Sequence, residues 1–185
     1  MAPKLNVVKV AFIGVGARGS AHAKQISAIE GTEVVAISDL YEDLAEKSSQ
    51  TCQEIGNGKR HKNITIYSGA ENKWKAMLKE VKPDAVFIST NWDNHAPMAI
   101  ETMKSGAHAF VEVPMATTID DLWKIVNTSE KTRKHCMMME NVNYGRDELM
   151  FLNMCRKGVI GEFLHAEAAY IHELRFQMKE EHRGT

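Results

Sequence analysis

Short apolar runs alternate with longer stretches of mixed polarity over the first 140 residues. The runs predict six strands, at residues 10–13, 33–39, 64–67, 85–89, 107–112 and 136–139. The stretches between them predict helices at residues 20–29, 41–55, 72–80, 95–105 and 118–131. Strands that alternate with helices through short connections are typical of a parallel sheet with helices on both faces. We therefore predict an α/β fold with a Rossmann-type doubly wound parallel sheet.

The pattern changes after residue 141. Residues 144–156 predict a helix, 158–161 a turn and 162–171 an apolar strand, after which the sequence becomes polar. Residues 142–185 are too few for a domain of ordinary size, and an apolar strand needs neighbours to pair with. We therefore expect a nucleotide-binding domain over residues 1–141. Residues 142–185 would then be the first part of an α+β second domain that is truncated in this sequence.

A glycine-rich turn follows the first predicted strand. Gly14, Gly16 and Gly19 form a Gly-x-Gly-x-x-Gly pattern between an apolar run and a helical stretch, as in sites that hold a dinucleotide pyrophosphate. Gly14 permits the tight turn, Gly16 lets the backbone approach the phosphates, and Gly19 lets the helix pack closely on the strand. The free N–H groups at the start of the helix then face the anion.

An acidic residue ends the second predicted strand. Asp39 follows the last glycine of the turn by about 20 residues, and a carboxylate there accepts hydrogen bonds from an adenosine ribose. The same charge would repel the 2′-phosphate of NADP. We therefore expect NAD as the cofactor. Asp39 is also placed to help cap the next helix, as Thr118-Ile-Asp-Asp121 is placed to open a later one as a capping box.

Composition and charge limit the classes of partner. The chain is 44% apolar and 25% charged with a formal net charge of −1. It has no basic stripe for nucleic acid and no apolar run that would span a bilayer, so we expect neither partner. We interpret Lys59-Arg60-His61-Lys62 as a solvated loop, and the sequence offers no metal-binding pattern.

The sulfur-containing residues indicate the compartment. Cys52, Cys136 and Cys155 are odd in number and widely spaced, which argues against a disulfide framework and favours buried or half-buried thiols in a reducing compartment. We interpret Met137-Met138-Met139 as core filler. No secretory signal precedes the first strand, so a cytoplasmic location is expected. Export is the alternative if a signal has been removed.

Polar residues follow three of the predicted strands. They lie in Thr90-Asn-Trp-Asp-Asn-His95, Glu112-Val-Pro114 and Glu140-Asn-Val-Asn143. The carboxyl ends of parallel strands share one rim of the sheet, where ligands bind. In the first segment Trp92 could lie against an apolar ring, and Asp93, Asn94 and His95 offer polar contacts. Alternatively, Asp93 is a helix N-cap and His95 a first-turn histidine with its hydrogen bonds satisfied.

Together these residues resemble the Gfo/Idh/MocA superfamily of nicotinamide-dependent sugar oxidoreductases. Within it, the chain is most similar to glycoside hydrolase family 109, the NAD-dependent α-N-acetylgalactosaminidases. Ordinary superfamily members carry Glu-Lys-Pro where this chain has Glu112-Val113-Pro114, and the glycosidase branch resembles this chain in having Glu-Val-Pro. The other shared segments are Gly16-Ala-Arg-Gly19, Ser38-Asp-Leu-Tyr41, Trp92-x-x-His-Ala-Pro-Met98, His135-Cys-Met-Met138 and Ala169-Tyr-Ile-His172.

The resemblance implies roles for individual residues. The implied NAD contacts are Arg18 and Gly19 in the glycine turn, Asp39 at the ribose, Trp92 to His95 along the cofactor, Glu112 and Val113 near the nicotinamide, and Asn141. Tyr170 matches a substrate-facing tyrosine and His172 lies on the same strand face, which makes them the implied catalytic residues. Without the resemblance, Tyr170 would be an ordinary strand aromatic and His172 a surface histidine.

The implied activity is a redox-neutral glycosidase cycle. NAD⁺ oxidises a ring hydroxyl, Tyr170 removes the neighbouring proton, the glycosidic oxygen leaves by elimination, water adds, and the hydride returns. The expected substrate is a sugar or N-acetylgalactosaminide, and the resemblance also implies homo-oligomers formed through the second-domain sheet. One alternative is an NAD-dependent sugar oxidoreductase, which Val113 disfavours because it replaces the lysine that assists hydride transfer. The other is a catalytically idle NAD-binding module.

Overall fold

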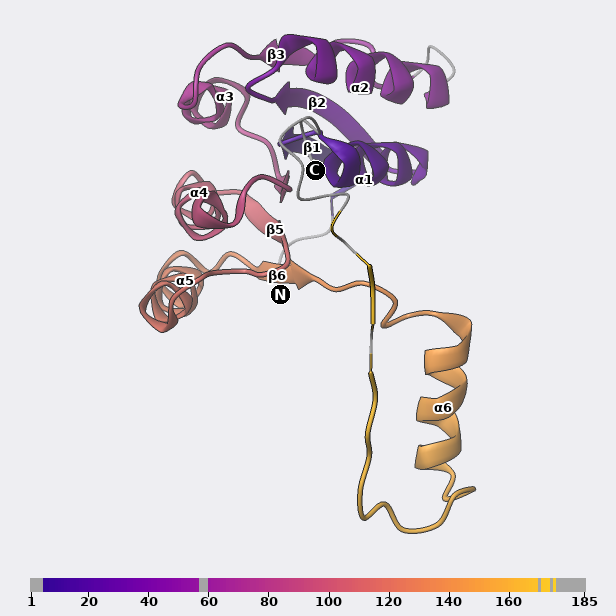
Figure 1. The fold of residues 1–185 in the computed structure, drawn as a ribbon. Coiled ribbons are helices and arrows are strands. Elements are labelled where there is room, and N and C mark those ends of the chain that lie inside the picture. The colour runs from indigo at the N-terminus through magenta and orange to yellow at the C-terminus, as the bar shows by residue number, and fades with distance from the viewer. Residues whose placement is uncertain (1–4, 57–59, 170, 174, 176–185) are drawn as a thin grey trace. The chain divides into compact units, whose positions relative to one another are not determined.

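The computed structural model describes residues 5–56, 60–169, 171–173 and 175. The chain divides into two compact units, the first ending at Met139 and the second beginning at Glu140 (Figure 1). The strands of the first unit are β1 (Val8–Ile13), β2 (Thr32–Ser38), β3 (Thr65–Tyr67), β4 (Ala85–Ile88), β5 (His108–Glu112) and β6 (Cys136–Met139). Its helices are α1 (Ala17–Ala28), α2 (Glu42–Ile55), α3 (Lys73–Val81), α4 (Trp92–Lys104) and α5 (Ile119–Thr132).

The six strands form one parallel sheet in the order β3-β2-β1-β4-β5-β6. This is the order of a doubly wound dinucleotide-binding sheet, so the predicted Rossmann-type fold is confirmed. Element boundaries differ from the prediction by a few residues. Helices α1 and α4 each begin three residues earlier than predicted, at Ala17 and at Trp92. The earlier start of α4 takes Trp92 to His95, the end of the first predicted rim segment, into its first turn.

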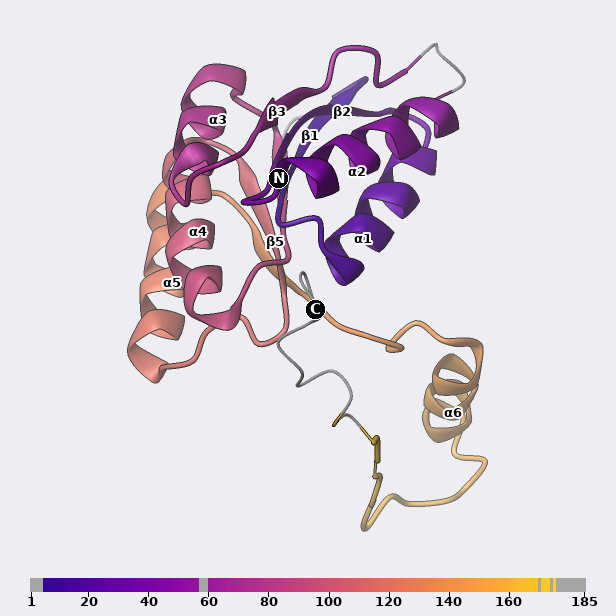
Figure 2. The same ribbon diagram turned by 45° about the horizontal axis from the view of Figure 1, so that its top comes forward.

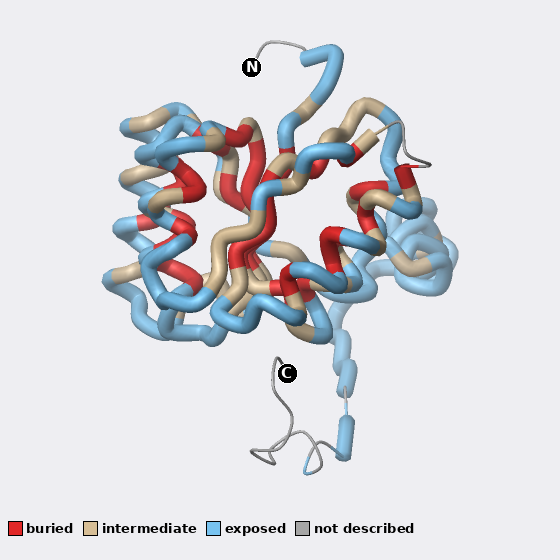
Figure 3. The backbone as a smooth tube through the Cα atoms, turned by 90° about the horizontal axis from the view of Figure 1, so that it is seen from above, coloured by how far each residue is buried: buried red, intermediate tan, exposed pale blue. Residues whose placement is uncertain are grey.

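Helices cover both faces of the sheet. Figure 2 shows α1 and α2 on one face and α3, α4 and α5 on the other. The period-two alternation of a strand sends Val10 and Phe12 into the core beneath α1 and α2, and Ala11 and Ile13 into the core beneath the other three helices. Buried positions accordingly follow the strands and the inward sides of the helices (Figure 3). The two cores pack against both faces of β1, β2 and β4, whose pairing brings their carboxyl ends side by side.

A buried histidine lies in the segment that we interpreted as a solvated loop. His61 is fully buried with a left-handed φ of 57°. Its Nδ1 accepts a hydrogen bond from Val34 N at 2.9 Å, and its Nε2 donates to Ser27 O at 2.9 Å. Since β3 pairs with β2 only from Ala36 onward, His61 supplies the acceptor that a longer strand would have given. The solvated-loop prediction is therefore wrong for His61. The basic residues on both sides of it suggest an exposed segment, whereas the ring itself is buried.

The predictions for Met and Cys side chains were partly wrong. Met137 and Met138 are 48% and 38% exposed, because β6 is an edge strand. Helix α5 packs on one face of β6. Helix α1, on the opposite face of the sheet (Figure 2), packs on the central strands β1, β2 and β4. Cys52 is buried and Cys136 half-buried, as expected, but Cys155 is exposed.

The second unit contains helix α6 (Arg146–Arg156), in which no residue is buried. The strand predicted at residues 162–171 is absent from the part of it that the structure describes, where residues 162–169 and 171 form neither helix nor strand. A strand requires a hydrogen-bonded neighbour, and no described segment pairs with these residues. Leu164 and Ile171 are accordingly 87% and 88% exposed.

Candidate functional site

The glycine turn connects β1 to α1 with the geometry that its sequence predicts. Gly14 has a φ of 81°, and a Cβ atom built on it would lie 2.5 Å from Ser89 O. A Cβ atom on Gly19 would overlap the carbonyl oxygen of Gly14, so only glycine allows α1 to pack this closely. Gly16 is the N-cap of α1 and has no side chain to occupy the space beside the first free N–H groups. The turn therefore presents bare backbone at the start of a helix.

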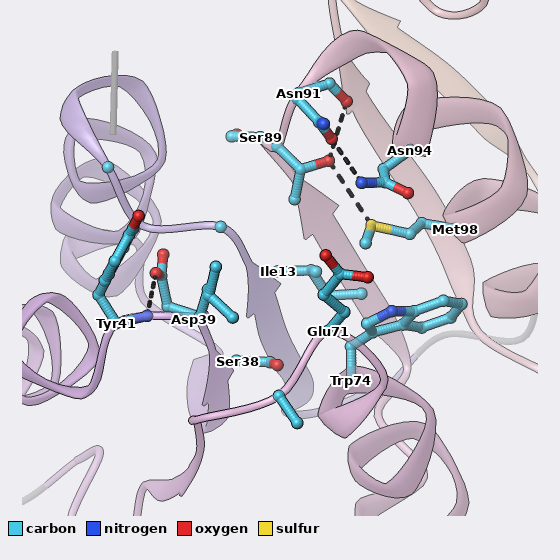
Figure 4. A pocket seen from close by; sticks show the side chains of 15 residues that line it. Ile13, Ser38, Asp39, Tyr41, Glu71, Trp74, Ser89, Asn91, Asn94 and Met98 are labelled. Atoms are coloured by element: carbon cyan, nitrogen blue, oxygen red, sulfur yellow. Dashed lines mark hydrogen bonds between the residues drawn. The ribbon is translucent and has the colours of Figure 1, made fainter. Parts of the chain in front are cut away.

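Asp39 ties the end of β2 to this turn. Its Oδ2 accepts a hydrogen bond from Val15 N at 2.7 Å. Its Oδ1 accepts one from Tyr41 N at 2.9 Å, which Figure 4 shows. Asp39 is therefore not the side-chain cap that we predicted: α2 begins at Glu42, its N-cap is Tyr41, and no side chain caps it. A carboxylate oxygen has two lone pairs, so each oxygen retains capacity for a ribose hydroxyl. Asp39 thus both shapes the turn and offers acceptors beside it.

A pocket opens over the carboxyl ends of β1, β2 and β4 (Figure 4). It is lined by Ile13, Gly14, Gly16, Ser38, Asp39, Leu40, Tyr41, Ala70, Glu71, Trp74, Ser89, Thr90, Asn91, Asn94 and Met98. Trp74 and Met98 contribute apolar surface from α3 and α4, while Glu71 and Asn94 contribute polar groups. Ser89 Oγ is buried and has no hydrogen-bond partner among the described residues. Bare backbone, a carboxylate and an unpartnered hydroxyl fit a dinucleotide with its pyrophosphate and ribose groups.

Several pocket residues were not predicted from the sequence. Glu71 lies just before α3 and Trp74 in its first turn, and this helix follows the very short β3. The strand order could have indicated them. A third strand next to β2 brings its own carboxyl end, and the residues that follow it, to the same rim of the sheet. Trp74 falls within the helix predicted at residues 72–80, which does not by itself indicate a pocket residue.

The predicted cofactor contacts at the start of α4 differ in their exposure. Trp92 is 64% exposed, and Asp93 and Asn94 lie in the exposed first turn. The N-cap is Asn91, so the alternative of Asp93 as N-cap is wrong. His95 is buried, with Nδ1 2.7 Å from Pro114 O and Nε2 3.0 Å from Thr90 O. The ring thus lies between the ends of β4 and β5 with a carbonyl oxygen at each nitrogen, and a neutral imidazole donates a hydrogen bond to one of the two.

A charged cluster lies between α1 and the end of β5. Glu112 Oε1 is 2.6 Å from His22 Nε2 and 3.7 Å from Arg18 Nε. Glu112 Oε2 accepts a hydrogen bond from Val113 N at 3.2 Å. Arg18, Glu112 and Val113 were predicted contacts, and the structure brings them together. His22 was not predicted, because 90 residues separate it from Glu112.

The remaining predicted site residues belong to the second unit. Asn141 and His172 are exposed there, and Tyr170 lies outside the described residues. Within the described ranges, no group of three His, Cys, Asp or Glu side chains is arranged to hold a metal ion. No helix in this part of the chain is both long and apolar enough to cross a membrane.

The fold and the pocket define an NAD-binding domain of the oxidoreductase type. Residues 8–140 match the family model described as oxidoreductase family, NAD-binding Rossmann fold, and the chain belongs to this Gfo/Idh/MocA family. Residues 144–184 match the model of the glycosyl hydrolase 109 C-terminal domain. These matches confirm the family resemblance and NAD as the cofactor.

The chain is similar along its whole length to curated proteins of glycosyl hydrolase family 109. Glycosyl hydrolase family 109 protein 1 of Akkermansia muciniphila is 58% identical over 184 residues, which are 100% of this chain and 37% of that protein. A Shewanella oneidensis protein named alpha-N-acetylgalactosaminidase is 52% identical over 185 residues, which are 100% of this chain and 39% of that protein. The chain thus spans less than half the length of these relatives.

Solved structures show the same fold. Myo-inositol 2-dehydrogenase from Lactobacillus plantarum superposes with a TM-score of 0.72 at 22% identity, covering 85% of this chain and 43% of that one. Scyllo-inositol dehydrogenase from Lactobacillus casei, solved with NAD(H) and scyllo-inositol, gives 0.72 at 17% identity, covering 84% and 43%. A Listeria innocua NAD-binding protein gives 0.69 at 30% identity, covering 84% and 42%.

Proposed function

We propose that this chain supplies the cofactor-binding part of an NAD-dependent glycosidase that cleaves α-N-acetylgalactosaminides in a redox-neutral cycle. The observation that carries the proposal is the 52% identity, over all 185 residues, to a protein named alpha-N-acetylgalactosaminidase. Glu112-Val113-Pro114 supports the same assignment, since Val113, directly after β5, has an apolar side chain where ordinary superfamily members carry lysine.

The residues of the first unit would bind and orient the cofactor. The free N–H groups at the start of α1, after Gly16, would hold the pyrophosphate. Asp39, which fixes the turn by accepting from Val15 N, would also accept hydrogen bonds from the adenosine ribose. Arg18, Gly19, Glu112, Val113, Asn141 and the first turn of α4 from Trp92 to His95 complete the proposed contacts. Because the ring nitrogens of His95 already face two carbonyl oxygens, its contact would use other atoms. Bound NAD supplies reversible hydride acceptance.

The second unit would carry the catalytic residues. We assign proton abstraction to Tyr170 and place His172 beside the same substrate. A tyrosine has an ordinary pKa near 10, so Tyr170 must be activated by its surroundings to act as a base at neutral pH. In this proposal residues 1–141 bind the cofactor, and residues 142–185 contribute to substrate binding and self-association. A homo-oligomer and a cytoplasmic location are part of the proposal, without nucleic-acid or membrane partners.

The test is turnover of p-nitrophenyl α-N-acetylgalactosaminide by the chain with NAD⁺, following p-nitrophenol and NADH together. Release of p-nitrophenol without accumulating NADH supports the glycosidase. NADH that accumulates with free sugars would show a sugar oxidoreductase, and NAD⁺ binding without either reaction would show an idle module. Tyr170→Phe should abolish release, whereas Tyr144→Phe, at a tyrosine that is 80% exposed, should leave it unchanged.

A further inference from the structure

His22 joins the first helix to the far half of the sheet. It lies in α1, and its Nε2 is 2.6 Å from Oε1 of Glu112, the last residue of β5. Both side chains are largely buried, at 19% and 15% exposure. An ionised carboxylate only accepts hydrogen bonds, so His22 Nε2 is the donor. Arg18 is a weaker partner, since its Nε is 3.7 Å away and its side chain is 58% exposed.

The position of Glu112 in the sheet indicates which half of the cofactor it faces. A doubly wound sheet binds one mononucleotide on each half, and Asp39 at the end of β2 marks the adenosine half. β5 lies on the other side of β1, so the end of β5 belongs to the nicotinamide half. The oxidised nicotinamide ring carries a positive charge that the reduced ring lacks. A carboxylate fixed at this end of the sheet therefore attracts NAD⁺ more than NADH.

We propose that His22 is a positioning residue, which holds the Glu112 carboxylate at the nicotinamide side and thereby sets a preference for NAD⁺ over NADH. The proposal rests on the proposed cofactor site. Glu112 Oε2 also accepts from Val113 N, so each oxygen has one protein donor and the carboxylate plane is fixed from two sides. Without His22, the remaining contacts of Oε1 would be the distant, exposed Arg18 and water.

The experiment is calorimetric titration of the 185-residue chain with NAD⁺, NADH and ADP-ribose, which lacks the nicotinamide. His22→Ala should weaken NAD⁺ about tenfold, the scale of one charge-assisted hydrogen bond, and NADH by less. ADP-ribose affinity should stay within about twofold, because the adenosine half is untouched. His22→Gln keeps an N–H donor and should restore most of the NAD⁺ affinity. Gln25→Ala, an exposed substitution on the same helix, is the matched control.

The outcomes separate this proposal from the cofactor site itself. If the unmodified chain binds none of the three ligands, the cofactor site is refuted and His22 with it. If the unmodified chain binds NAD⁺, but His22→Ala weakens all three ligands equally or none, only the positioning role is refuted. Glu112→Gln is the second variant if His22→Ala does not fold, as judged by circular dichroism. It preserves shape, removes the charge, and must lower the NAD⁺ to NADH affinity ratio.

Discussion

Replacing Asp39 with alanine should loosen the glycine turn as well as the ribose site. The substitution removes the acceptor for Val15 N, in a part-buried bond of 2.7 Å, and for Tyr41 N, in an exposed bond of 2.9 Å. Val15 lies inside the turn, so the carboxylate fixes the backbone that receives the pyrophosphate. The sequence alone suggests a ribose contact and a helix cap for Asp39, but not the hydrogen bond to Val15 N.

The cost follows from the burial of each bond. A hydrogen bond to a charged group contributes about 1.5–3 kcal/mol when it is shielded from water, which applies to Val15 N. The exposed N–H of Tyr41 regains water, so its loss costs about 0.5–1 kcal/mol. Asp39→Ala should therefore lower the free energy of unfolding by about 2–4 kcal/mol in the absence of NAD. Asp39→Asn keeps one acceptor oxygen and should lose about half as much.

Urea denaturation followed by circular dichroism measures this difference directly. Glu46→Ala, which removes an exposed acidic side chain from α2, is the control for lost charge and should change stability by less than about 0.5 kcal/mol. If Asp39→Ala unfolds at the same urea concentration as the unmodified chain, the carboxylate does not hold the turn. Asp39 would then serve the cofactor alone.

Three further predictions concern the packing of α1, the buried hydrogen bonds of His61 and the reactivity of two thiols. Gly19→Ala places a Cβ atom on the carbonyl oxygen of Gly14 and should cost about 1–3 kcal/mol, seen as a lower Tm; an unchanged Tm would contradict the close packing of α1. His61→Ala leaves one buried N–H and one buried C=O unpaired and should cost about 2–5 kcal/mol in urea, whereas an unshifted midpoint would show that neither bond matters. Burial raises the pKa of the Cys136 thiol to about 11, so iodoacetamide at about pH 8 should modify exposed Cys155 first, and Cys136 should react faster only as the pH approaches 11; equal peptide labelling by mass spectrometry would refute this.

The sequence predicts the sheet well because apolar runs and glycine turns act locally. The run before Gly14 and the acid at Asp39 are each interpretable within one strand–turn unit, and together they locate the rim of the sheet. Contacts between segments that are far apart in the sequence are harder to predict. His22 meets Glu112 across 90 residues of sequence, and neither residue suggests the other. Such contacts depend on how helices lie on the sheet, which hydrophobic periodicity does not specify.

Edges and irregular segments were predicted least well. Met137 reads as core filler because it is apolar, yet its exposure depends on the edge position of β6. His61 reads as surface because its neighbours are basic, yet it completes hydrogen bonding beside a short strand. The predicted strand at residues 162–171 has no described neighbour to pair with. In each case the result depends on which partner lies opposite, a property of the tertiary structure.

The central claim is that the rim of this sheet is an NAD site. Calorimetric titration of the chain with NAD⁺ and with NADP⁺ tests it most directly. We predict saturable binding of one NAD⁺ per chain and weaker binding of NADP⁺, because the 2′-phosphate would lie against the Asp39 carboxylate. Absence of NAD⁺ binding, or equal affinity for the two cofactors, would contradict the claim.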